Sequence, residues 1–216
     1  MSLLGRFRAA LGRDDASLLA RARVDVRMGL GLNPPACLAP LNRAIAALER
    51  LPNTPEIAML LGRALRAKAQ TLSGQSARDY RARAVAKVTA MLDRPNIAPA
   101  LRADLYSALA QGWLPLPEEA AQDPDLSYRQ LLRAKEAQAE ALSVPSVVFH
   151  LEMAEIALAL CQHPLCPTPR DMAALAWHHA RAVDALTPTA DQSASADALK
   201  AAVVHLFPGL RLGESP

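Results

Sequence analysis

Prolines divide this chain into segments of helical length. Of its 17 prolines, 13 fall in five clusters, within residues 34–40, 52–55, 95–99, 115–124 and 164–169. Proline costs about 3 kcal/mol inside a helix but is tolerated in the first helical turn. The clusters therefore mark joints between helices, and the Ser-Gly-Gln-Ser stretch at 73–76 marks one more.

Between these joints, apolar residues recur at helical spacing. We expect helices at 14–30, 41–51, 56–72, 77–93, 99–113, 127–142, 146–162, 170–187 and 194–206, with a short one at 2–12. Aromatic residues make up only 4% of the chain, and no segment has the pattern of a strand. The sequence predicts a single all-α domain over 1–216, with a helical array at 14–206 and a tail at 207–216. The helices would stack as antiparallel pairs in a short α-solenoid or form a single irregular bundle.

Four Ala- and Leu-rich helices are each followed by a short turn that contains proline. The turn prolines Pro52, Pro95, Pro145 and Pro188 are 43, 50 and 43 residues apart. A recurring pair of helices at such spacing is typical of α-solenoids, in which each pair packs against its neighbours.

The segment PEIAMLLGRAL at 55–65 resembles the first helix of a tetratricopeptide repeat. Leu61-Gly62 matches that family's Leu-Gly pair, and Leu65 stands where a tyrosine is usual. The next helix ends in AMLDRP and resembles the second helix of the repeat, with Pro95 as its closing proline. The unit is about seven residues longer than the usual 34, and the other units match only in helix pattern, so the repeat is degenerate.

This resemblance implies protein binding in a groove lined by side chains of the first helices. The groove positions that it implies are Glu56, Met59, Arg63 and Arg66, with Arg102 and Tyr106 on the next helix of this type. Arg63 and Arg66 are three residues apart and therefore neighbours on a helix surface, where they could hold a carboxylate. An ordinary solvated basic face is the alternative for these positions.

Charge is unevenly distributed along the chain. Residues 1–95 hold 16 Lys and Arg against 7 Asp and Glu, whereas residues 96–216 hold 8 against 14. Such a dipole favours an acidic partner at the N-terminal half, although compositional drift is another explanation. The alternative is a helical nucleic-acid-binding or regulatory protein. Arg78, Arg81, Arg83 and Lys87 form a basic run that could bind phosphates, but aromatic residues for base stacking are scarce.

The cysteines and histidines give a weak indication of a metal site. Cys161, His163 and Cys166 lie close together in sequence, but the cysteines are five residues apart and Pro164 stiffens the loop between them. Helical spacing places His179 on an apolar stripe. We find no catalytic motif, and we expect a non-enzymatic protein with no cofactor.

The N-terminal segment 1–13 has two interpretations. Leu3, Leu4, Phe7 and Leu11 fall on one helical face, which could cap the array or place residues 3–11 on a membrane surface. No apolar run is long enough to span a bilayer, and the arginines at 6 and 8 do not fit an export signal. We therefore expect a cytoplasmic adaptor, assembly factor or small subunit of a complex, binding an acidic or C-terminal segment of another protein.

Overall fold

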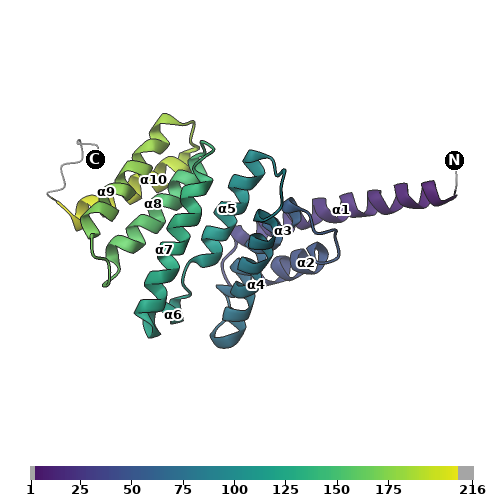
Figure 1. Cartoon of the computed structure of the whole chain (residues 1–216), viewed down its shortest axis with the longest axis horizontal. Helices are drawn as coiled ribbons and strands as arrows, with labels where there is room; N and C mark the ends of the chain where they lie inside the picture. Colours follow the sequence, from purple (N-terminus) through teal and green to yellow (C-terminus); the bar gives the residue numbers. More distant parts are fainter. Residues whose placement is uncertain (1–2, 209–216) are drawn as a thin grey trace. The chain divides into compact units, whose positions relative to one another are not determined.

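The computed structural model describes residues 3–208, with side chains from residue 14 onward. All of the regular elements in this range are helices (Figure 1). They are α1 (Leu3–Gly31), α2 (Leu38–Leu48), α3 (Pro55–Ala69), α4 (Gly74–Leu92), α5 (Pro99–Trp113), α6 (Pro117–Gln122), α7 (Pro124–Ala141), α8 (Val147–Gln162), α9 (Pro169–Ala182), the 3-10 helix η1 (Val183–Ala185) and α10 (Ala190–Leu206). The predicted all-α fold is confirmed, and helices adjacent in sequence pack together.

The prolines take the position that their chemistry favours. Five helices begin with one, at Pro55, Pro99, Pro117, Pro124 and Pro169. Thr54 caps α3, where its Oγ1 accepts a hydrogen bond from Ile57 N at 3.4 Å. Gly74 begins α4 with φ of +60°, a conformation that glycine adopts readily and that reverses the chain after α3.

The helix boundaries differ by a few residues from those predicted, and two differences are larger. The segments expected at 2–12 and 14–30 form the single helix α1. The short helix α6 was not predicted, because Pro117 and Pro124 at its two ends suggested a loop. It forms because Pro117 occupies its first turn and the Glu119 carboxylate accepts a hydrogen bond from Leu116 N at 3.3 Å.

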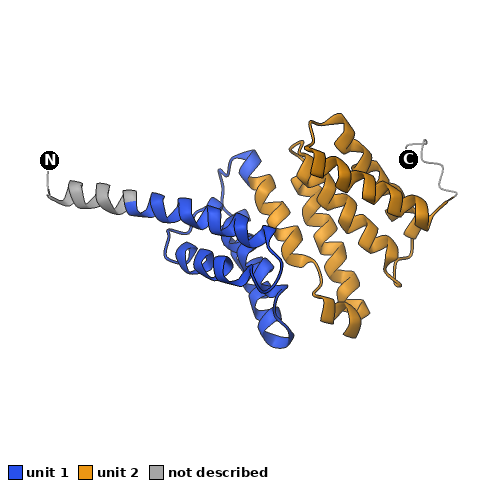
Figure 2. Cartoon of the chain, turned by 180° about the vertical axis from the view of Figure 1, so that it is seen from behind, with its two compact units in different colours: residues 1–101 blue, residues 102–216 orange. Residues whose placement is uncertain are grey.

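The structure divides the chain into two compact units, where the sequence suggested one continuous array. Unit 1 comprises residues 1–101 and unit 2 residues 102–216 (Figure 2). The division falls within α5, after Leu101, so that unit 1 contains α1 to α4 and unit 2 contains most of α5 and all later helices.

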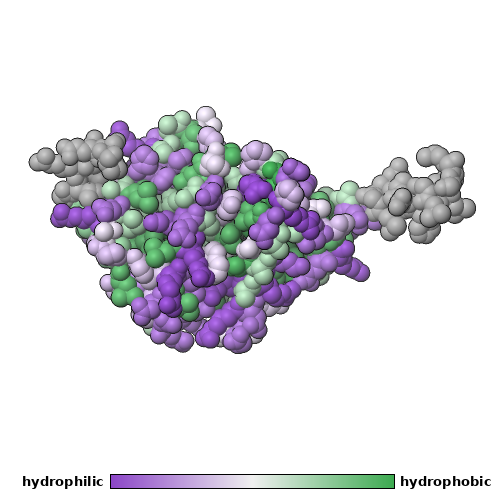
Figure 3. All heavy atoms as spheres, viewed as in Figure 1, coloured by the Kyte–Doolittle hydropathy of each residue, from purple (hydrophilic) through white to green (hydrophobic). Residues whose placement is uncertain are grey.

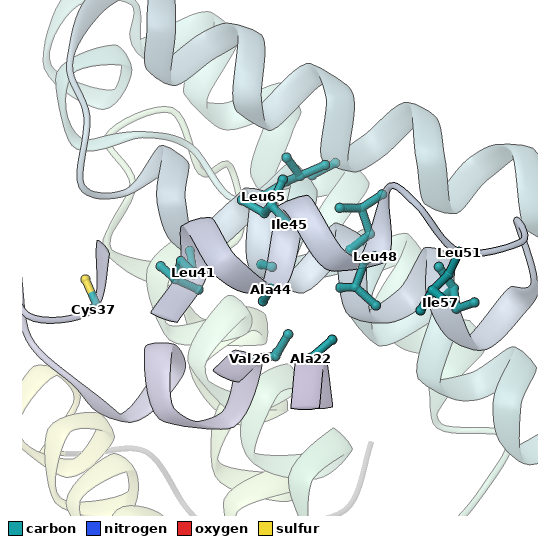
Figure 4. Packing of buried hydrophobic residues seen from close by; sticks show 14 residues of the cluster. Ala22, Val26, Cys37, Leu41, Ala44, Ile45, Leu48, Leu51, Ile57 and Leu65 are labelled. Atoms are coloured by element: carbon teal, nitrogen blue, oxygen red, sulfur yellow. The ribbon is translucent and has the colours of Figure 1, made fainter. Parts of the chain in front are cut away.

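The core of unit 1 is built from small and aliphatic side chains. Ala22 and Val26 on α1 face Ala44 on α2, and Leu48 and Leu65 extend the same cluster toward α3 (Figure 4). Close approach of the helices depends on glycine: Gly29 of α1 lies against α2, and Gly62 of α3 lies against α4.

In unit 2, α8 is the central helix. It packs against α7, α9 and α10, and this agrees with its nearly continuous apolar sequence. Its buried residues include Phe149, Ile156 and Leu160. Gln138 of α7 is fully buried and donates a hydrogen bond from Nε2 to Phe149 O at 2.9 Å, which fixes α7 against the start of α8.

Candidate protein-binding surface

The predicted groove residues of α3 are more enclosed than an open groove requires. Glu56 is half-buried and forms a salt bridge with Arg23 of α1. Met59 is 9% exposed and Arg66 is 5% exposed, while Arg63 is half-buried. Of the four, Arg63 therefore remains the basic side chain best placed to reach a ligand.

This enclosure has a physical reason in the position of α3. The helix packs against α1, α2 and α4. Its apolar stripe of Ile57, Leu61 and Leu65 is buried as expected, but a helix with three neighbours has little free circumference. Periodicity identifies one buried face and does not reveal how many neighbours cover the rest.

The two other predicted residues, Arg102 and Tyr106, belong to unit 2. Both are half-buried on α5, and Tyr106 packs against a cluster that contains Ala103, Ala141 and Phe149. The structure thus assigns the six predicted binding residues to two different units.

A basic surface that was only partly predicted lies on unit 1. Arg83 of α4 forms a salt bridge with Glu49 at the end of α2, and the exposed Arg50 follows Glu49 in sequence. Lys87 is one helical turn after Arg83, and Arg94 donates from Nη1 to Asn53 O at 3.1 Å in the α2–α3 loop. We call Arg50, Arg83, Lys87 and Arg94 the basic ridge, and all four residues are exposed.

The ridge is assembled by the fold. Arg83 and Lys87 share one side of α4, whereas Arg78 and Arg81, from the same basic run, fall on another side. Arg94 joins the ridge through its hydrogen bond to the α2–α3 loop, and Arg50 is the sequence neighbour of Glu49, the partner of Arg83. From the sequence, only Arg83 and Lys87 could be predicted to lie together, because residues four apart are neighbours on a helix surface.

Tyr80 lies beside the ridge and is already engaged by cations. Lys68 Nζ is 4.3 Å from the centre of its ring, and Arg83 Cζ is 5.4 Å from it. Cation–π contacts of this kind hold the two side chains over the aromatic surface. The ring is therefore not free to stack on a ligand.

The Cys161–Cys166 segment does not form a metal site among the described residues. His163 Nδ1 accepts a hydrogen bond from Leu165 N at 3.2 Å, and its ring lies 5.2 Å from that of Tyr128. In residues 14–208 no three His, Cys, Asp or Glu side chains are placed to hold a metal ion together. Burial raises the pKa of the Cys161 thiol, and Cys166 adds to this effect.

Unit 2 contains a histidine pair that sequence spacing could not bring together. His150 Nδ1 of α8 lies 2.9 Å from His179 Nδ1 of α9, and the ring of His178 meets that of His179 edge-on. His179 is 9% exposed, on the apolar stripe where it was expected. Burial, with His150 and His178 nearby, lowers its pKa from 6.5 to about 4.

A hydrogen bond between two Nδ1 atoms requires one ring to donate and the other to accept, so the accepting ring is neutral, and the lowered pKa of both histidines favours the neutral form of the donor as well. Burial also lowers the pKa of His150, and His178 contributes to that shift. On the same helix, Glu152 Oε2 accepts a hydrogen bond from Ser107 Oγ of α5 at 2.7 Å. These contacts join α5, α8 and α9, and we assign them a structural role.

Comparison of the chain with protein-family models, curated proteins and solved structures found no match in any of the three. Among the described helices, none combines the length and the apolar character that a membrane-spanning helix needs. The apolar side chains at 3–11, predicted to cap the array or to contact a membrane, lie outside the described side chains.

Proposed function

We propose that this chain is a non-enzymatic protein-binding module, in which unit 1 recognises an acidic segment of a partner protein. The observation that carries the proposal is the agreement between charge and structure. Unit 1 holds 16 Lys and Arg against 7 Asp and Glu, and unit 2 holds 8 against 14. Since each unit is a compact body, this asymmetry gives the molecule one basic unit and one acidic unit, which favours steered association with an acidic ligand.

The basic ridge is the surface of unit 1 that best fits such a ligand. Arg83 and Lys87 lie on α4, and Arg50 and Arg94 lie in the turns that follow α2 and α4. The acidic residues next to these cations in sequence are Glu49 and Asp93. Arginine holds carboxylates through paired hydrogen bonds, and a helical framework keeps the ridge side chains in a fixed relation. Hydrophilic and apolar residues are interspersed on the face of the molecule seen in Figure 3.

Nucleic acid is the second ligand class that a basic surface can attract. Binding of single strands combines phosphate contacts with stacking of bases on aromatic side chains. Unit 1 has only Phe7 and Tyr80 as aromatic residues, and the Tyr80 ring already carries Lys68 and Arg83. The ridge therefore offers charge without a stacking surface, and this favours a protein ligand.

The proposal is tested by fluorescence anisotropy with three labelled probes. The probes are an amphipathic peptide of Glu and Leu, the same peptide with Lys in place of Glu, and a single-stranded oligonucleotide. The ridge variant Arg50→Glu/Lys87→Glu is compared with the control Arg129→Glu/Arg170→Glu, which makes the same change of net charge at exposed sites of unit 2.

We expect binding of the acidic peptide that weakens with salt, is lost in the ridge variant and persists in the control. Equal loss in both variants would show that net charge alone is responsible. Tighter binding of the oligonucleotide than of the acidic peptide would favour the nucleic-acid alternative.

A further inference from the structure

Exposed apolar side chains gather on the first and last helices. Residues 14–208 contain eight large apolar side chains that are exposed, and six of these lie on α1, just after it, or on α10. The six are Val24, Met28, Leu30, Leu32, Val204 and Leu206. Exposed apolar surface concentrated in this way is typical of interaction sites.

The outer side of α1 combines apolar and basic residues. Val24 is 58% exposed and Met28 is 47% exposed, one helical turn apart on the side opposite the buried Ala22. Arg21 and Arg27 flank them, and both are exposed.

The acidic residue of this part of α1 faces elsewhere. Asp25 is half-buried, and its Oδ1 accepts a hydrogen bond from Arg43 Nη2 of α2 at 2.6 Å. Asp14 and Asp15 lie about two turns before Arg21. The outward charge around Val24 and Met28 is therefore basic.

The outer side of α10 combines apolar and acidic residues. Val204 is 43% exposed, and the exposed Ala194, Ala198 and Ala201 leave the backbone open to close approach. Asp197 has a side chain that is 73% exposed even though it pairs with Lys200.

Lys200 does not cancel this acidic character. It also contacts Asp184, and its own side chain is only 18% exposed. Asp191, in the first turn of α10, is exposed as well. The outward charge of α10 is therefore acidic.

We propose that the outer face of α1 in one copy of this chain docks on the outer face of α10 in a second copy. Charge complementarity identifies the occupant, because the α1 face carries Arg21 and Arg27 beside Val24 and Met28, whereas the α10 face carries Asp191 and Asp197 together with Val204. Two α1 faces placed together would oppose like charges, and so would two α10 faces. The inference does not rest on the proposed function, since it uses neither the basic ridge nor α3.

Spacing along the two helices also matches. Arg21 and Met28 are seven residues apart, and so are Asp197 and Val204. Seven residues make about two helical turns. A parallel alignment of α1 and α10 can therefore set Arg21 opposite Asp197 and Met28 opposite Val204. A contact between two different faces is heterologous, and its repetition gives an open chain or a ring in place of a closed dimer.

Sedimentation velocity and light scattering across a wide concentration range test this contact. Two charge-reversal variants are needed, Arg21→Glu/Arg27→Glu on α1 and Asp191→Lys/Asp197→Lys on α10. All four positions are exposed, and circular dichroism melting checks that the variants fold.

We expect the mass of the unmodified protein to rise with concentration beyond that of a dimer, and less steeply at high salt. Each variant alone should stay at the chain mass of 23.1 kDa, because it lacks one of the two faces. Their equimolar mixture should associate beyond the dimer again, because the reversed α1 face of one variant complements the reversed α10 face of the other, just as the two unmodified faces complement each other. The apolar variant Val24→Gln/Met28→Gln should also remain monomeric.

Three results would overturn the inference. The first is a protein that stays monomeric at all concentrations, as it would if α1 were occupied by a different molecule or within its own chain. The second is association that survives both charge reversals. The third is association that is lost only in the α1 variant, which would indicate a symmetric contact between α1 helices.

Discussion

A β-carbon placed on Gly62 of α3 would lie 2.5 Å from Cγ2 of Val88 on α4. Val88 is fully buried, so its side chain has no space into which it could move. Gly62 is the second residue of the Leu-Gly pair on which the resemblance to tetratricopeptide repeats is based. The structure gives that glycine a physical reason, because α3 and α4 approach each other closely at this point.

We predict that Gly62→Ala destabilises the protein. Alanine in a helix is ordinarily about 1 kcal/mol better than glycine, but overpacking costs about 1–3 kcal/mol, and we expect a net loss of about 1 kcal/mol. Thermal and urea unfolding measure the change. Gly31→Ala is the control, because a β-carbon there meets no atom within 4 Å.

The double variant Gly62→Ala/Val88→Ala provides a second check. Alanine at position 88 leaves space for the new methyl group at position 62. The double variant should therefore lose less free energy of unfolding than the two single variants lose in sum. A Gly62→Ala protein as stable as the Gly31→Ala control would show that α3 and α4 are not in close contact.

The histidine pair predicts loss of stability in mild acid. His179 has a pKa of about 4 in the folded protein, compared with 6.5 for the ordinary group. Between pH 4 and pH 6.5 the unfolded chain binds more protons than the folded one. The free energy of unfolding is therefore highest above pH 6.5 and falls as the pH drops toward 4. A shift of this size corresponds to roughly 3 kcal/mol.

Urea unfolding from pH 8 to pH 4 measures this dependence. The variant His179→Gln should lose most of it, whereas His205→Gln should retain it, because His205 is exposed on α10 and lies outside the pair. An identical pH profile for the parent and for His179→Gln would contradict the neutral, buried state of the pair.

The three cysteines are expected to differ in reactivity. Cys166 is half-buried, whereas Cys37 is 3% exposed and Cys161 is 7% exposed. Since the thiolate is the reactive form, burial protects Cys161 by restricting access and by raising its pKa. Iodoacetamide should therefore modify Cys166 first, as followed by peptide mass spectrometry.

The same reaction in denaturant is the control for cysteine reactivity. There the three thiols should react at similar rates, since the differences in burial are lost. If Cys161 in the folded protein reacted as fast as Cys166, the placement of Cys161 in the core of unit 2 would be wrong.

Helix positions were largely predictable from the sequence because proline acts locally. Each of the nine segments expected between 14 and 206 contains a helix, and five helices of the structure begin with proline. The helix α6 was missed because two prolines seven residues apart resemble a loop. The side chains of Glu118 and Glu119 at its first turn were the available signal.

The binding surface was less predictable, because it depends on which helices lie side by side. Counting residues along α3 gave one buried stripe but not the burial of Met59 and Arg66. The ridge required the contact between Arg83 and Glu49, 34 residues apart. The histidine pair required two residues 29 apart. Such pairings are set by tertiary packing and leave no periodic signal in one sequence.

The central claim is that unit 1 binds a partner protein through its basic ridge. Capture from native lysate, read by quantitative mass spectrometry, tests it most directly when the unmodified protein, Arg50→Glu/Lys87→Glu and the control Arg129→Glu/Arg170→Glu are compared. We predict that the unmodified protein and the control capture the same set of proteins rich in acidic segments, and that the folded ridge variant does not capture this set. Capture of the same set by all three proteins, or of nothing beyond a tag-only sample, would contradict the claim.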